Sequence, residues 1–159
     1  MRSIKKLLCH QSLLFKNKII IILKEKLKEV KLLGKPKVLL KNSFNSFKQL
    51  EDIFFPLSLE IIESESIVDC PKLQRLMIPN NVKEIQINAI LNCQQLKTFN
   101  SPQHLLENLP KDQIVELEIT SSTLKELKQN DIKGLDKLQS LTLPENIEKI
   151  PEEIFKECS

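Results

Sequence analysis

Apolar residues recur along this chain with a period of 23 residues, and the stretch from Leu73 to Leu96 shows the pattern most regularly. Counted from Leu73 as offset 0, apolar residues or cysteine stand at offsets 3, 5, 12, 17 and 20 of nearly every unit. A fixed period of this length is typical of repeat architectures, in which each unit buries its apolar face against its neighbours. Six units begin in phase, at Leu27, Leu50, Leu73, Leu96, Ile114 and Leu138.

A proline follows the first apolar positions of four units, in the form apolar-x-x-Pro. Proline cannot donate a hydrogen bond to a sheet, so it ends a strand. A short strand that stops at a proline and returns every 23 residues predicts a stack of parallel rungs. The last unit is expected to follow the same pattern, with Leu141, Leu143, Ile147, Ile150 and Phe155 in the core. The four prolines are Pro56, Pro79, Pro102 and Pro144.

Two parts of the chain depart from the period. The unit that begins at Leu96 is only 18 residues long, so residues 103–113 must take a different return path. Residues 1–26 match the pattern incompletely, because Lys16 and Lys24 occupy positions where the core requires apolar groups. We therefore expect two parts: residues 1–26 form either a basic N-terminal cap or a degenerate first repeat, and residues 27–159 form a repeat domain of about five to six units.

The Leu-x-x-Leu-x-Ile start of the Leu73 unit resembles the leucine-rich repeat, and the whole unit resembles the BspA-like subfamily. The segment from Leu76 to Ile85, followed by Ile90 and Cys93, carries this resemblance. It covers about residues 27–159 and implies an α/β leucine-rich-repeat solenoid: a curved parallel β-sheet of short strands with short helical, 3-10 or irregular returns. The short unit departs from the family pattern, and so does a scarcity of small residues near the middle of each unit. The resemblance implies binding of other macromolecules rather than catalysis.

Groups that carry catalytic chemistry lack the spacing that catalysis requires. His10 and His104 are the only histidines, and neither has a nucleophile or an orienting carboxylate at a recognisable distance in sequence. Gly34 and Gly134 are isolated, so there is no glycine-rich phosphate loop. No pair of the four cysteines has the spacing of a zinc site. We expect a protein that is not an enzyme and that needs no cofactor or metal.

Side chains at offsets 2 and 4 alternate with the buried positions of each predicted strand, so they face outward from the sheet. In the leucine-rich repeat this face is concave and commonly carries the partner. Phe54 and Met77 would be neighbours there, with Asp52 and Arg75 beside them, which resembles a small interaction hot spot. Alternatively, Phe54 belongs to the apolar run 53–57 and packs under a loop. The candidate partner-binding residues are Asp52, Phe54, Arg75, Met77, Asn100 and Glu118.

Charge is distributed unevenly along the chain. Residues 1–50 contain 13 lysines and arginines but only two acids, Glu25 and Glu29. This segment is either a solvated face or an electrostatic tether to an anionic membrane or nucleic acid. The principal hypothesis is an intracellular scaffold or adaptor that binds another protein, and a surface adhesin is a further alternative.

Localisation is expected to be cytoplasmic, or else nuclear, because residues 1–23 do not form a convincing signal peptide or span and the cysteines are interpreted as reduced thiols. The C-terminal repeat has no polar cap after Cys158, so we expect either that the chain is a fragment of a longer array or that a partner or a second copy covers the last rung, the latter by self-association through that end.

Overall fold

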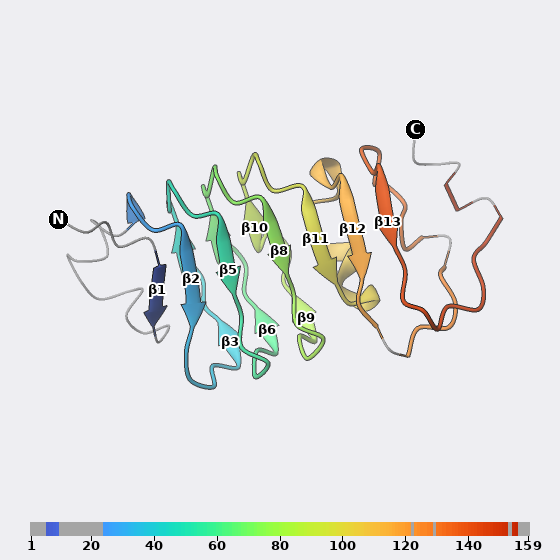
Figure 1. Ribbon diagram of the computed structural model, residues 1–159, viewed down its shortest axis with the longest axis horizontal. Coiled ribbons are helices and arrows are strands. Elements are labelled where there is room, and N and C mark those ends of the chain that lie inside the picture. The colour runs from blue at the N-terminus through green and yellow to red at the C-terminus, as the bar shows by residue number, and fades with distance from the viewer. Residues whose placement is uncertain (1–5, 10–23, 122, 129, 153, 156–159) are drawn as a thin grey trace.

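The protein forms an elongated stack of parallel rungs, which Figure 1 shows from the side with the long axis horizontal. The computed structural model describes residues 6–9, 24–121, 123–128, 130–152 and 154–155. In chain order the elements are β1 (Lys6–Cys9), β2 (Glu29–Leu32), β3 (Val38–Leu39), β4 (Phe44–Asn45), β5 (Asp52–Phe54), β6 (Ile61–Ile62), β7 (Ile67–Val68), β8 (Arg75–Met77), β9 (Glu84–Ile85), β10 (Ile90–Leu91), β11 (Thr98–Ser101), the 3-10 helices η2 (Gln103–Asn108) and η3 (Lys111–Gln113), β12 (Glu116–Ile119) and β13 (Ser140–Thr142).

Each of the regular units contributes one strand to each of three parallel sheets. The first strands of the units pair in the orders β1-β2-β5 and β8-β11-β12-β13, and β5 lies beside β8, so that together they form one surface, called here the front sheet. The second strands form the sheet β3-β6-β9, and the third strands form the sheet β4-β7-β10. The predicted leucine-rich-repeat solenoid is confirmed, and its returns are more regular than expected.

The register of the front sheet stacks equivalent positions of successive units on one another. Leu76 of β8 lies opposite Phe99 of β11, which lies opposite Leu117 of β12 and then Leu141 of β13. The first three of these side chains are at most 2% exposed. The repeat therefore builds continuous apolar columns through the molecule, because no unit can cover its own core face. In the units that begin at Leu27, Leu50 and Leu73, the predicted core residues are buried, apart from the half-buried Phe55.

The corners on either side of the third strands carry residues with left-handed backbone. They fall at two positions of the repeat, and six non-glycine residues with φ between 53° and 62° occupy them: Asn42, Glu65, Asn88, Ser46, Asp69 and Asn92.

A buried small residue follows the first corner position in each of these units. The expected scarcity of small residues is wrong at this position, where Ser43, Ser66 and Ala89 are at most 1% exposed. A small side chain suits a buried position beside a tight turn, because interiors are closely packed. Ser43 Oγ donates to the carbonyl of Leu40 at 2.6 Å, which satisfies its polar group inside the core.

The short unit returns through two 3-10 helices instead of two strands. η2 follows Pro102, and its Leu105 and Leu106 are buried, as is Leu109 after it. A 3-10 helix advances less per residue than a strand, so it spans a shorter distance around the unit. The apolar residues that fill the core therefore stand at positions different from those of the regular units. The predicted different return path is confirmed, and the two back sheets end with β9 and β10.

The last unit is less buried than its pattern predicts. Leu138, Leu141, Leu143 and Ile147 are only partly buried, and Ile150 is 47% exposed. Phe155 is 54% exposed. The prediction that Ile150 and Phe155 lie in the core is therefore wrong for the described residues. A core position in a solenoid is covered by the next rung, and no described residue stacks on the far side of this one.

The N-terminal prediction falls largely outside the described residues. Within 6–9, β1 pairs in parallel with β2, and Leu7 lies opposite Val30. Whether residues 1–26 form a cap or a repeat stays a prediction. The described helices are short, and none of them could cross a membrane.

Candidate binding surface on the front sheet

Side chains on the front sheet alternate between core and solvent. In β8, Leu76 is buried while Arg75 and Met77 are exposed, and β12 repeats this alternation over four residues. Outward positions therefore form two rows across the strands, one rung after another. The first row holds Glu29, Asp52, Arg75, Thr98, Glu116 and Ser140; the second holds Lys31, Phe54, Met77, Asn100, Glu118 and Thr142. The structure thus brings all six predicted partner-binding residues onto one face.

Two large apolar side chains lie exposed at the centre of this face. Phe54 is 39% exposed and Met77 is 54% exposed. They line one shallow pocket of about 410 Å³ together with Leu57, Ile78 and Pro79. Leu57 is itself 74% exposed. An apolar concavity open to solvent is the usual form of an anchor site for a partner side chain.

Asp52 and Arg75 flank the apolar pair and are joined to each other. Arg75 donates from Nε to Asp52 Oδ1 at 2.6 Å and from Nη2 to Oδ2 at 3.4 Å. This two-pronged contact with the carboxylate raises the pKa of the Arg75 guanidinium above its ordinary value. Because Arg75 is 60% exposed, the pair contributes little to folding, about 0.2–1 kcal/mol. Its main effect is to fix both side chains in position.

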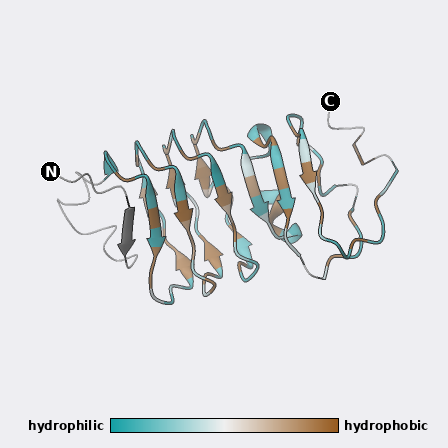
Figure 2. Cartoon of the chain, viewed as in Figure 1, coloured by the Kyte–Doolittle hydropathy of each residue, from teal (hydrophilic) through white to brown (hydrophobic). Residues whose placement is uncertain are grey.

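The C-terminal side of the face is acidic. Thr98 Oγ1 donates to Glu116 at 3.0 Å, and the amide of Asn100 donates to Glu118. Both donors are neutral, so neither carboxylate is offset by a positive side chain through these contacts. Figure 2 shows mostly apolar colour in β5, whereas hydrophilic and apolar colours alternate along β12.

A second pocket, of about 580 Å³, lies beside the 3-10 helices of the short unit. It holds Lys111, Lys128 and Asp131, which the sequence patterns did not single out. The only feature of the sequence that indicated an unusual structure here was the short length of this unit. Lys111 Nζ donates to the carbonyl of Lys133 at 2.9 Å, and the backbone N–H of Lys128 donates to Asp131 at 2.7 Å. His104 Nε2 lies 2.9 Å from the carbonyl oxygen of Val82. These groups are engaged in holding the return together.

Two thiols are buried in the described part of the core. Cys70 and Cys93 are free and buried at the same position of successive units. The neighbouring Cys93 thiol and burial raise the pKa of the Cys70 thiol, which disfavours the nucleophilic thiolate. Cys70 Sγ instead donates to the carbonyl of Phe44 at 3.4 Å. Among the described residues, no group of three or more histidine, cysteine or acidic side chains is placed to hold a metal.

A comparison with protein families identifies the same repeat. The family model described as BspA type Leucine rich repeat region matches in 6 copies, over residues 23–112 and 110–159. Among solved structures, the chain is similar to a leucine rich cell surface protein from Faecalibacterium prausnitzii A2-165, with 14% sequence identity and a TM-score of 0.48. That match covers 85% of this chain and 29% of the other. No curated protein matched the chain.

Proposed function

The chain belongs to the BspA-type leucine-rich repeat family, and on this premise we propose that it is a non-catalytic scaffold or adaptor that binds another protein on the front sheet. The observation that carries the proposal is the exposed apolar pair of Phe54 and Met77 in one pocket. The surface proposed for the partner comprises Asp52, Phe54, Arg75, Met77, Asn100 and Glu118.

The chemistry of this surface supports protein binding. Interface energy concentrates in a few central apolar or arginine side chains that become fully desolvated, surrounded by polar groups that exclude water. Phe54 and Met77 supply the apolar centre, and the Asp52–Arg75 pair supplies a fixed polar border. Burying the exposed part of two such side chains contributes on the order of 1–3 kcal/mol to association.

The test is the double variant Arg75→Glu with Met77→Asp. Both residues are exposed, so the variant is expected to unfold at nearly the same temperature as wild type while losing its partners in an affinity pull-down from native cell extract. The matched control is Lys83→Glu with Ile87→Asp, which makes the same change in net charge in the same unit on a different face and likewise reverses the exposed member of an ion pair. Equal capture by the front-sheet variant and the control contradicts the proposal. Unfolding of the front-sheet variant would place its side chains in the core instead.

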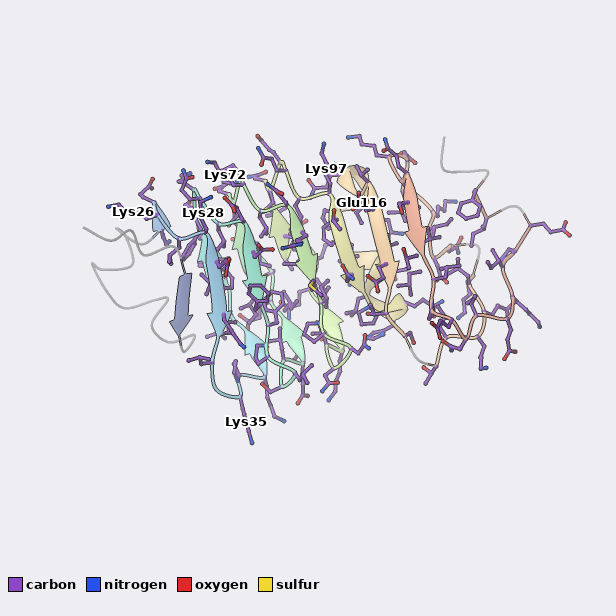
Figure 3. All side chains as sticks on the ribbon, in the orientation of Figure 1. Lys26, Lys28, Lys35, Lys72, Lys97 and Glu116 are labelled. Carbon is purple, nitrogen blue, oxygen red and sulfur yellow. The ribbon has the colours of Figure 1, made fainter. Side chains whose placement is uncertain are left out.

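The alternative proposal is an electrostatic tether through basic residues 1–50. Figure 3 shows Lys26 and Lys28 at one end of the row of lysines along the edge where the front strands begin. Against the tether, Lys28, Lys37 and Lys41 each form an ion pair with a glutamate of the following unit. The two hypotheses differ in salt dependence. Binding to anionic vesicles or nucleic acid weakens steeply with salt, whereas binding centred on Phe54 and Met77 does not.

Self-association through the C-terminal unit is a further proposal about partners. It is supported by the exposure of Ile150 and Phe155, which stand at repeat positions that inner units bury. Light scattering as a function of concentration tests it, and a strict monomer at high concentration contradicts it.

The cytoplasm is the proposed compartment, because Cys70 and Cys93 are free thiols on which the packing of two units depends. Detection of the protein on the surface of intact cells would favour the adhesin alternative.

A further inference from the structure

A carboxylate borders the apolar pocket of the front sheet. Glu118 lines the pocket together with Phe54 and Met77. The register runs from Met77 to Asn100 and on to Glu118, so the carboxylate-bearing residue lies two strands away from the apolar anchor. Two strand spacings amount to about 10 Å. An apolar site and an acidic site therefore lie at a fixed separation on one rigid surface.

The acidic site is more negative than its surroundings. Glu116 and Glu118 are both exposed, and the side chains that donate to them, Thr98 and Asn100, carry no charge. Within the part of the chain that the structure describes, neither glutamate has a cation within ion-pair distance. Asp52, an acid of the same face, is by contrast paired with Arg75. Figure 3 shows Glu116 on β12, and Glu118 lies two residues further along this strand, so two carboxylates without an ion pair among the described residues lie on it.

From this arrangement we infer that the partner presents a protein segment with a large apolar side chain and, two to four residues away, a lysine or arginine. The apolar side chain enters the pocket between Phe54 and Met77, and the cation reaches Glu118 or Glu116. An extended segment advances about 3.3 Å per residue, and a long basic side chain spans the remainder of the distance. The inference rests on the proposed function, and it adds the chemistry of the partner.

Charge complementarity decides between classes of partner segment. An acidic segment would place like charges beside Glu116 and Glu118, and their repulsion would weaken binding. A neutral segment avoids this repulsion, and a basic segment is attracted instead. The contribution of an exposed charge pair is modest, so we expect it to determine which segments are preferred while the apolar anchor provides most of the affinity.

The experiment uses a phage-displayed library of random dodecapeptides selected on the immobilised full chain. The enriched peptides are expected to contain leucine, isoleucine, methionine or phenylalanine with a lysine or arginine two to four residues away. Synthetic copies are then titrated against wild type, Met77→Asp, the double variant Glu116→Gln with Glu118→Gln, and Glu84→Gln as a control on another face. The glutamine double variant should weaken binding by up to about fivefold, and Met77→Asp should weaken it more. The control should bind as wild type does.

Different failures have different consequences. Enriched peptides without basic residues, or peptides that lose binding to Met77→Asp but not to the glutamine double variant, overturn the charge inference and leave the front-sheet proposal standing. Peptides that bind Met77→Asp as tightly as wild type overturn both, and so does a selection that enriches no sequence. Circular dichroism of each variant verifies that it is folded.

Discussion

The Nζ atom of Lys83 lies 2.6 Å from Oε2 of Glu60, although the two residues are 23 positions apart in the chain. Lys37, one unit before Glu60, approaches the other carboxylate oxygen at 2.9 Å. Stacking thus brings together charges that the sequence holds apart. The basic first third of the chain is partly neutralised by acids of the following units, since a lysine of one rung faces a glutamate of the next.

Glu60 should make the protein sensitive to acid. Its contacts with Lys83 and Lys37 lower the pKa of the Glu60 carboxyl from 4.5 to about 2. A pKa that is lower in the folded state stabilises the fold above the unfolded value of 4.5, and this contribution is lost as the pH falls toward about 2. Wild type is expected to lose more in melting temperature across this window than Glu60→Gln does. The difference should shrink in about 1 M salt, and parallel curves for the two proteins would contradict the prediction.

Glu65→Asn should stabilise the protein. Glu65 has φ 53°, a left-handed conformation that an ordinary side chain adopts only at a cost. Asparagine tolerates it and already occupies the equivalent corners at Asn42 and Asn88. The gain in free energy of unfolding is expected to be about 0.5–1 kcal/mol, measured by urea unfolding. Glu65→Ala is the control, because it also removes the ion pair with Lys41 but keeps the strain. No difference between the two variants would exclude the explanation from backbone strain.

Leucines at the same position of the repeat should contribute differently to the free energy of unfolding, depending on whether a neighbouring rung covers them. Leu76 and Leu141 share one position of the repeat, but the first is 0% exposed and the second only partly buried. Leu76→Ala should cost about 2–5 kcal/mol in free energy of unfolding. Leu141→Ala should cost less than half as much, because it removes fewer contacts. Equal losses in urea unfolding would mean that the last rung is covered in solution.

The thiols of Cys70 and Cys93 should be unreactive while the protein is folded. Both are buried, and each donates to a backbone carbonyl, Cys93 to that of Leu91 at 3.4 Å. With Cys9 and Cys158 replaced by serine, a chromogenic disulfide reagent is expected to modify no thiol in buffer and both thiols in urea. Rapid reaction in buffer would show that the two units open locally below global unfolding.

The sequence allowed the buried and the outward positions to be predicted because the spacing of the repeat carries that information. A rung that stacks on a similar rung places equivalent residues in columns. The sequence alone therefore assigned Val30 and Ile53 to the core. The same alternation correctly placed Phe54 and Met77 at the surface. Their role in binding is a separate matter, which no pattern of burial encodes.

Other features did not follow from the pattern. Ile150 and Phe155 match the core spacing, yet their burial depends on a neighbouring rung and not on their own unit. The contact between Thr120 and Asn80, at 2.8 Å, joins residues 40 positions apart across the short unit, where the period no longer applies. The left-handed conformation of Glu65 was also not predicted, because glutamate gives no local signal for it.

Because both back sheets end at β9 and β10, the described rungs before and after this point differ in the number of ladders that join them. From β3 to β10 the rungs share two back ladders, and β2 and β5 share a front ladder as well. From Gln103 onward the described rungs share the front ladder and one isolated bridge, between Glu126 and Lys149. Amide hydrogens of β3, β6 and β7 should therefore exchange with solvent at a common slow rate. Those of the segment 125–150 should exchange faster, because the C-terminal rungs unfold locally while the rungs joined by the back sheets remain folded.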